Sequence, residues 1–378
     1  MKKFTKMWAI AACALFAGTA AVNAEDYTWK FVTAGDATTY AIRSDGSLWS
    51  WGWNEKGQGG NGVSERTATP TLADGNRVWK KAVGGKAYGF FLAEDGSLWA
   101  AGTHEGGVQG TNDGIDHKVL TRIGTDNDWA DMACSRFWGY SGFAIKTNGT
   151  LWAWGKNSAG QLGIGNTQAQ TAPVQVGADM DWKQVAAGCS SVLALKTDGS
   201  LWGWGFNMYS ELFGHEGKQL SPVRLGSETD WEQVVVIDFR AYAVKKDGTL
   251  WAWGDNANNL LGFNTPTEEE TTAEGNPVEV VTVPQITAPT HVTSIEGKVL
   301  TISGCENTLS VATGTDGVIE KVWMLGSNTD GALGDGKGLG NGNKDIPFAK
   351  VPVHPSLKSS LKFAGMSSGQ NYTVMLTT

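Results

Sequence analysis

The chain has 378 residues, a formal net charge of −8, 51 glycines and 18 tryptophans. The acidic balance argues against duplex nucleic acid as a partner, because phosphate binding depends on a surplus of lysine and arginine. The tryptophan content argues against a disordered chain, and so many glycines without a collagen-like period indicate many tight turns.

The first 24 residues have the pattern of a secretory signal. Lys2, Lys3 and Lys6 precede an apolar run, and Val22-Asn23-Ala24 supplies small residues for cleavage before Glu25. We therefore expect an exported protein, either secreted, periplasmic or on the cell surface. A lipoprotein anchored through Cys13 is the alternative. No later stretch reaches 18 consecutive apolar residues, so we expect no membrane span.

A glycine-centred repeat then dominates the chain. Asp-Gly or Asn-Gly followed by Ser/Thr-Leu-Trp recurs five times, with a divergent sixth copy. The repeat glycines are Gly46, Gly96, Gly149, Gly199, Gly248 and Gly317, at spacings of 50, 53, 50, 49 and 69 residues. Asp-Gly between β-type residues predicts a hairpin with a type I′ turn, in which both central positions have positive φ.

The remainder of each repeat predicts two more strands. A Gly-rich turn and a Pro-Val strand follow the hairpin, and a Trp-led strand such as WKQVAAG (from Trp182) leads to the next one. Four short strands per 50 residues are typical of a propeller blade. We therefore expect an all-β domain over residues 25–378, with the tryptophans buried between stacked blades.

These motifs resemble a known repeat. LWAWGKNSAGQLGIG (from Leu151) and VAAGCSSVLALKTDG (from Val185) are similar to the repeat of the regulator of chromosome condensation family. The resemblance implies seven blades. The Trp-led half occurs seven times if two divergent copies are counted, and the hairpin only six times. We therefore expect seven blades with an incomplete last one. Six blades, or a fragment, are the alternatives.

Departures from the repeat are the candidate partner-binding positions. An acidic run lies in an expected inserted loop at residues 264–291, which a plain surface loop also explains. Aromatic residues enlarge two other turns, where core packing is the alternative explanation. The candidates are Phe137, Trp138, Tyr140, Phe206, Tyr209, Phe213, Glu268, Glu269 and Glu270.

The sequence carries no recognisable catalytic, metal or cofactor motif. The histidines lack metal-ligand spacing, and three cysteines beyond the signal do not form a disulfide framework. We therefore expect a monomeric, non-catalytic binding scaffold that recognises a protein or glycan through loops on a propeller face. The alternative is a glycan lyase or hydrolase with acidic side chains in the central channel. The family resemblance implies two further roles, guanine-nucleotide exchange or inhibition of β-lactamases.

Overall fold

The chain folds almost entirely into short antiparallel strands. The computed structural model describes residues 28–136, 139–257, 260–263, 269–271, 277–279, 285–305, 308–326, 346–350, 363–369 and 372–377. One short 3-10 helix, η1 (Glu105–Gly107), interrupts the strands of this described part.

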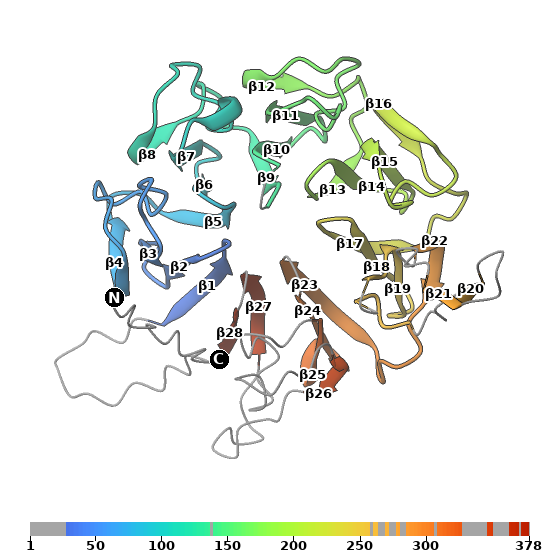
Figure 1. Ribbon diagram of the computed structural model, residues 1–378. Helices are drawn as coiled ribbons and strands as arrows, with labels where there is room; N and C mark the ends of the chain where they lie inside the picture. Colours follow the sequence, from blue (N-terminus) through green and yellow to red (C-terminus); the bar gives the residue numbers. More distant parts are fainter. Residues whose placement is uncertain are drawn as a thin grey trace, which may run out of the picture.

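Six four-stranded sheets form the blades and surround a common axis (Figure 1). The first three blades are β1 (Trp29–Ala34), β2 (Thr38–Arg43), β3 (Leu48–Gly52) and β4 (Thr67–Asp74); β5 (Trp79–Gly84), β6 (Tyr88–Ala93), β7 (Leu98–Gly102) and β8 (His117–Arg122); and β9 (Trp129–Cys134), β10 (Ser141–Lys146), β11 (Leu151–Gly155) and β12 (Gln170–Gln175). The next three are β13 (Trp182–Ala187), β14 (Ser191–Lys196), β15 (Leu201–Asn207) and β16 (Gly217–Arg224); β17 (Trp231–Ile237), β18 (Arg240–Lys245), β19 (Leu250–Asp255) and β22 (Gln285–His291); and β23 (Val299–Cys305), β24 (Thr308–Thr315), β25 (Val318–Gly326) and β26 (Ile346–Lys350).

The all-β propeller with four-stranded blades is therefore confirmed, and the described residues form six such blades, the alternative count. A two-stranded sheet of β27 (Phe363–Gly369) and β28 (Tyr372–Thr377) lies between the sixth blade and the first (Figure 1). Its first strand contacts both β1 and β23. Residues 285–291, expected in the inserted loop, form the outer strand of the fifth blade.

The hairpins form where Asp-Gly pairs predicted them, but five of the six use a different turn. In these five blades only the glycine has positive φ, as at Gly199 (φ +85°), and Lys196 N–H donates to the Ser200 carbonyl at 3.1 Å. This is a three-residue loop that ends in a glycine bulge. Only in the sixth blade do both central residues, Asp316 and Gly317, have positive φ.

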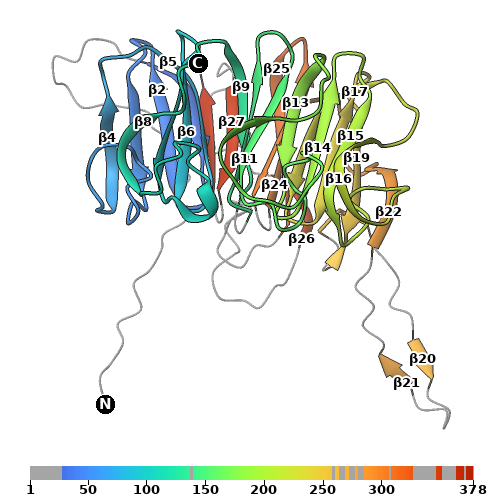
Figure 2. The ribbon, with the colours of Figure 1, turned by 90° about the horizontal axis from the view of Figure 1, so that it is seen from above.

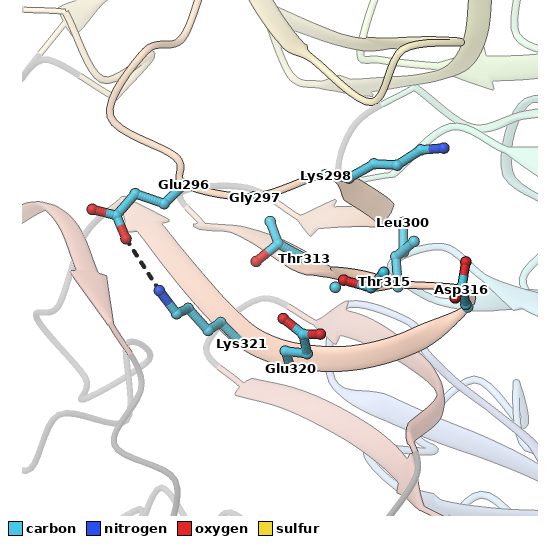
Figure 3. Close-up of a pocket in the computed structure, with 11 residues that line it drawn as sticks. Glu296, Gly297, Lys298, Leu300, Thr313, Thr315, Asp316, Glu320 and Lys321 are labelled. Carbon is cyan, nitrogen blue, oxygen red and sulfur yellow. Dashed lines mark hydrogen bonds and ion pairs between the residues drawn. The ribbon is translucent and has the colours of Figure 1, made fainter.

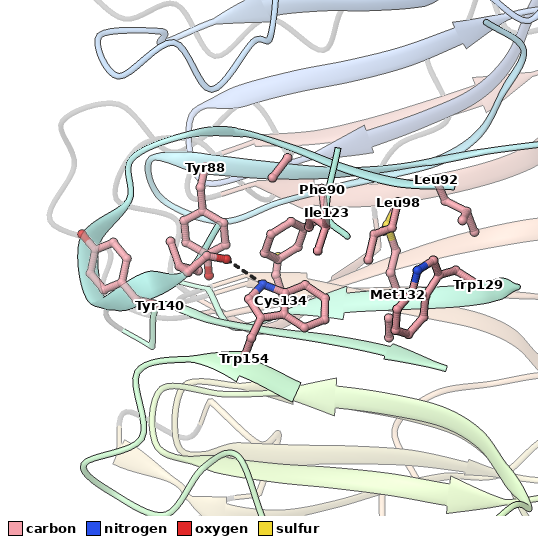
Figure 4. Packing of buried hydrophobic residues seen from close by; sticks show 13 residues of the cluster. Tyr88, Phe90, Leu92, Leu98, Ile123, Trp129, Met132, Cys134, Tyr140 and Trp154 are labelled. Carbon is pink, nitrogen blue, oxygen red and sulfur yellow. Dashed lines mark hydrogen bonds between the residues drawn. The ribbon is translucent and has the colours of Figure 1, made fainter. Parts of the chain in front are cut away.

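The hydrophobic core lies between blades. The cluster in Figure 4 joins Phe90 and Leu98 of the second blade to Met132 and Trp154 of the third. Trp154 is fully buried and its indole N–H donates to the Val108 carbonyl at 2.7 Å. Similar clusters join each successive pair of described blades. The expected burial between blades is confirmed for Trp79, Trp154, Trp204, Trp231 and Trp253, which are fully buried. Trp29, Trp49 and Trp51 of the first blade are only half-buried.

Hydroxyl groups connect the last sheet to the first blade. The Ser367 hydroxyl accepts a hydrogen bond from Ala34 N–H at 2.9 Å, and the Tyr372 hydroxyl donates to the Thr38 carbonyl at 3.0 Å. The contact with the sixth blade is mixed, because Ser310 and Ser368 hydroxyls lie 2.8 Å apart beside packed methionines. The ring therefore closes through polar contacts as well as apolar packing.

Antiparallel pairing gives the ring two distinct faces (Figure 2). We call the loop face the side that carries the loops between first and second strands and the connections between third and fourth strands. We call the hairpin face the opposite side, which carries the Asp-Gly hairpins and the connections between blades. Among the described residues there is no helix long and apolar enough to cross a membrane.

Candidate binding site on the loop face

Charged side chains gather where the loops between first and second strands approach the ring axis. Asp36, Lys86 and Arg136 come from these loops in the first three blades, and Asp238 comes from the fifth. Arg240 follows Asp238 at the start of β18. We call these five residues the inner-loop cluster.

Asp238 and Arg240 form an ion pair in this cluster. Their side chains are 16% and 5% exposed, and the guanidinium lies 3.4 Å from the carboxylate. The Cys189 thiol, from the fourth blade, donates to the same carboxylate at 3.4 Å. Burial raises the pKa of Asp238, and Arg240 opposes that rise.

Asp36 is the most deeply buried carboxylate of the cluster. It is 3% exposed, and the Cys305 thiol lies 3.8 Å from its Oδ1. Among the described residues its Oδ2 has no hydrogen-bond partner. Burial raises the pKa of Asp36, Arg136 lowers it, and Asp238 adds to the rise, so these groups act on one another. Arg136 also donates to the Ser368 carbonyl in β27.

This arrangement is suited to recognising charge rather than to nucleophilic chemistry. Burial raises the pKa of the Cys134 and Cys305 thiols to about 12, so neither is a thiolate at neutral pH. All three cysteines in the described part of the chain are free of disulfides. In that same part no three His, Cys, Asp or Glu side chains form a metal-ligand group.

The enzyme alternative requires acidic side chains near the ring axis, and Asp36 and Asp238 are two such groups. Burial raises the pKa of both carboxyl groups, and a neighbouring arginine, Arg136 and Arg240 respectively, opposes that rise. A glycosidase acid needs a free carboxyl and an open face for the sugar. The arginines and thiols instead occupy the surroundings of both carboxylates, which favours an electrostatic and structural role.

The predicted aromatic position at the third blade is part of the core. Tyr140 is 5% exposed and its ring lies 5.9 Å from that of Tyr88 (Figure 4). Burial and the nearby Glu105 raise the pKa of Tyr140 to about 12. The core-packing explanation therefore fits Tyr140. Phe137 and Trp138 lie outside the described residues.

The predicted aromatic positions of the fourth blade lie on the loop face. The Tyr209 ring packs 5.1 Å from Phe239, which directly follows Asp238 of the inner-loop cluster. Phe206 and Tyr209 are half-buried, and neighbouring Met208 is 47% exposed. Phe213 instead packs edge-on against Trp253 at 5.6 Å. The structure thus brings Tyr209, but not Phe213, beside the charged cluster.

The predicted acidic run falls partly within a small hairpin. Glu269 and Glu270 lie in β20 (Glu269–Thr271), which pairs with β21 (Pro277–Glu279) (Figure 2). Glu268 lies outside the described residues. The segment therefore contains regular structure rather than only a plain loop.

The sequence analysis missed the inner-loop cluster. Its members follow the Trp-led strand of each repeat, where small residues such as Gly188 in VAAGCSS are typical. A position-by-position comparison of the repeats would have shown Asp36, Lys86, Arg136 and Asp238 at nearly equivalent positions. That they meet depends on ring closure, which no single repeat reveals.

The chain is similar over part of its length to two curated proteins. It is 30% identical over 163 residues to the ultraviolet-B receptor UVR8 of Arabidopsis thaliana, covering 42% of this chain and 37% of that protein. It is 27% identical over 150 residues to the human protein RCC2, covering 39% of this chain and 19% of that protein. The match therefore spans well under two thirds of either relative.

Solved structures share the fold. Human WBSCR16 superimposes with a TM-score of 0.73 at 16% identity, over 94% of this chain and 87% of that one. Prp20p of Saccharomyces cerevisiae superimposes with a TM-score of 0.72 at 17% identity, over 92% and 81%. The model of the regulator of chromosome condensation (RCC1) repeat matches residues 45–92 and 148–195, and a second model of that repeat matches residues 29–58. The resemblance predicted from the sequence is confirmed: this propeller carries repeats of the regulator of chromosome condensation type.

Proposed function

We propose that this protein is an exported, non-catalytic binding propeller that recognises a protein partner through its loop face. The observation that carries the proposal is the Tyr209–Phe239 ring pair, because Phe239 stands in sequence between Asp238 and Arg240 of the inner-loop cluster. Aromatic residues and arginine are the residues enriched at interface centres.

The exposure pattern supports this assignment. Met208 is 47% exposed and directly precedes Tyr209 in sequence, so the loop face carries an exposed apolar side chain next to the ring pair. The aromatic side chains provide contact area, and the cluster provides charge selectivity.

The relatives support a binding role without identifying the partner. UVR8 is named a receptor, and the Prp20p structure is described together with its binding to Gsp1p and histones. Those partners belong to those proteins. The expected signal over residues 1–24 supports recognition outside the cytoplasm.

Two exposed methionines on opposite faces permit a matched test. Met208 lies on the loop face, and Met180, 61% exposed, lies on the hairpin face between β12 and β13. A photo-crosslinking residue replaces each in turn in the full chain, expressed in its native cells. We expect a discrete protein adduct from position 208 and none from position 180.

Direct binding then tests the contact itself. With the captured protein purified, Tyr209→Ala should weaken binding at least about fivefold, the loss typical of an interface anchor. Equal adducts from both faces, or unchanged affinity after Tyr209→Ala, would contradict the loop-face assignment. N-terminal sequencing of the protein recovered from these cells tests export, for which we expect Glu25 as the first residue.

A further inference from the structure

The two-stranded sheet of β27 and β28 has the register of the inner half of a blade (Figure 1). Its bulge between the pairs of Phe363 and Gly365 corresponds to the bulge between the pairs of Trp79 and Lys81 in the second blade. This register makes β28 the equivalent of β6, the second strand of that blade. Among the described strands, β28 pairs only with β27. We call its other edge the open edge.

The side chains of β28 are less buried than those of the six other second strands. Tyr372, Thr373, Val374 and Met375 are all half-buried. In contrast, β6, β14 and β18 are buried along their whole length, and β2, β10 and β24 are buried except at their last residue. Those strands have a third strand of their own blade beside them. The exposure of β28 therefore agrees with its lack of such a neighbour in the described part of the chain.

The first blade lacks cover on the side that faces this sheet. Trp51 is half-buried, whereas its equivalents Trp154, Trp204 and Trp253 are fully buried. Each of these three donates its indole N–H to a loop carbonyl of the preceding blade, as Trp204 does to Gln161 at 2.8 Å. The blade that precedes Trp51 in the ring is the two-stranded sheet. No described residue supplies the corresponding carbonyl to Trp51.

A backbone group of β4 lacks the corresponding neighbour. Along the ring, a loop of one blade donates a backbone N–H to the outer strand of the next, as Gly62 does to Lys118 at 2.8 Å and Gly165 to Leu220 at 2.8 Å. Strand register makes Ala68 the equivalent of Lys118 in the first blade. No described loop donates to the Ala68 carbonyl. Trp51 and Ala68 thus both lack a partner that the outer half of a seventh blade supplies.

The sixth blade, on the other side of the sheet, is complete. Its strands β25 and β26 are paired, and Lys321 pairs with Glu296 at 3.1 Å beside a surface pocket (Figure 3). Met375 of β28 packs against the apolar cluster of this blade, which contains Met324. No apolar cluster of described residues joins β28 to the first blade. The side towards the first blade is therefore the one that lacks apolar cover.

We propose that the open edge binds an extended segment of another polypeptide, which completes the seventh blade by strand addition. The third strands of the first, third, fourth and fifth blades read Leu-Trp-x-Trp-Gly, and their glycine pairs with the first residue of the second strand. At the open edge that residue is Tyr372. The glycine is required because a Cβ at Gly155, for example, lies 2.3 Å from a backbone oxygen. The partner therefore carries this pentapeptide, followed by a loop that reaches Trp51 and Ala68.

A synthetic peptide of residues 150–176 is the probe, because it contains the third strand, loop and fourth strand of the third blade. Labelled with fluorescein and titrated with the full chain, it should show a saturable rise in anisotropy. The Gly155→Ala peptide differs by one methyl group and should bind at least about tenfold more weakly, because alanine is strained at positive φ. Trp51→Phe in the chain keeps an aromatic ring without the indole N–H and should weaken binding about fivefold.

A chain extended after Thr378 by residues 148–176 covers its own open edge. We expect it to bind no peptide and to unfold at a higher urea concentration than the chain without the extension, because Trp51 and β28 gain apolar cover.

The proposal would be overturned if the peptide did not bind, if the Gly155→Ala peptide bound equally well, or if the extended chain kept its affinity for the peptide. A dimer that the peptide dissociates, seen by sedimentation, would assign the open edge to a second copy and contradict a separate polypeptide. Crosslinking from Met208 on the loop face should be the same in the extended chain, so the two proposals fail separately.

Discussion

Glu211 is a buried carboxylic acid at a position that two other blades fill with glutamine. It is fully buried in the connection after β15, and its Oε2 accepts from Tyr209 N–H at 2.8 Å. Gln58 and Gln161 accept through Oε1 from the N–H two residues earlier, at 3.1 and 2.9 Å. At Glu211 a fully buried carboxyl group therefore accepts the hydrogen bond that a neutral amide accepts in the other two blades.

Burial raises the pKa of Glu211 to about 7, from an ordinary 4.5, and its hydrogen bonds only partly oppose this. The folded state holds the Glu211 proton more tightly than the unfolded state does. The contribution of this group to the free energy of unfolding is therefore fully present below pH 4.5. It is lost as pH rises towards 7. The accumulated loss above pH 7 is about 3 kcal/mol. Glu211→Gln removes the titration while keeping the hydrogen bond.

We therefore expect Glu211→Gln to raise the free energy of unfolding by about 3 kcal/mol at pH 8.5 and to change it little at pH 4. Urea unfolding followed by tryptophan fluorescence, from pH 4 to 8.5, measures the difference between the two proteins. Gln161→Glu is the matched variant, since it should introduce a loss of the same sign. Parallel pH curves for wild type and Glu211→Gln would refute the reasoning.

Three further predictions concern the repeat itself, each measured by urea unfolding. Lys196→Met should lower the free energy of unfolding by about 2 kcal/mol, because it removes an ammonium group that lies against two tryptophan rings. Lys183→Met, at a surface ion pair, should lower it by under about 1 kcal/mol. Similar losses in both variants would show that the rings do not stabilise the Lys196 ammonium. Gly199→Ala should lower the free energy of unfolding more than Gly177→Ala. Both glycines have positive φ, but only a Cβ at position 199 meets a backbone carbonyl oxygen, at 2.3 Å. Equal losses in the two variants would contradict this. Tyr372→Phe should lower the free energy of unfolding by about 1 kcal/mol, because it removes the hydrogen bond from the Tyr372 hydroxyl to the Thr38 carbonyl of the first blade. An unchanged midpoint of urea unfolding would show that this hydrogen bond does not contribute to closure of the ring.

The fold was predictable because one repeat explains it. Each Asp-Gly pair needs a turn, and each tryptophan needs a neighbouring blade to cover it, so composition and spacing lead to stacked four-stranded blades. The turn type was wrong in five blades, since a single positive-φ glycine at positions such as Gly199 suffices for a three-residue loop. Only Asp316-Gly317 has two positive φ angles.

The candidate site was less predictable because it is assembled by closure of the ring. Asp36 and Asp238 are some 200 residues apart in sequence, yet Asp238 adds to the rise in the pKa of Asp36, and Arg136 opposes the rise in both. No local pattern reveals that meeting. A departure from the repeat does not by itself distinguish a surface aromatic residue from a core one. Tyr140 and Tyr209 both depart from the repeat, but Tyr140 is packed in the core and Tyr209 lies on the loop face.

The sixth blade shows that a repeat protein can change one position while the rest of the ring stays the same. In the third, fourth and fifth blades a lysine lies against two tryptophans of its own blade, so a change in one blade leaves the others intact. In the sixth blade Thr313 stands opposite Val299, where Lys196 stands opposite Trp182 in the fourth. Lys321 lies 5.7 Å from the Trp323 ring and pairs with Glu296 at 3.1 Å, so a cation from the neighbouring strand contacts the remaining tryptophan. The contact between a cation and a ring is therefore kept in a blade that has lost the residue that supplies it elsewhere.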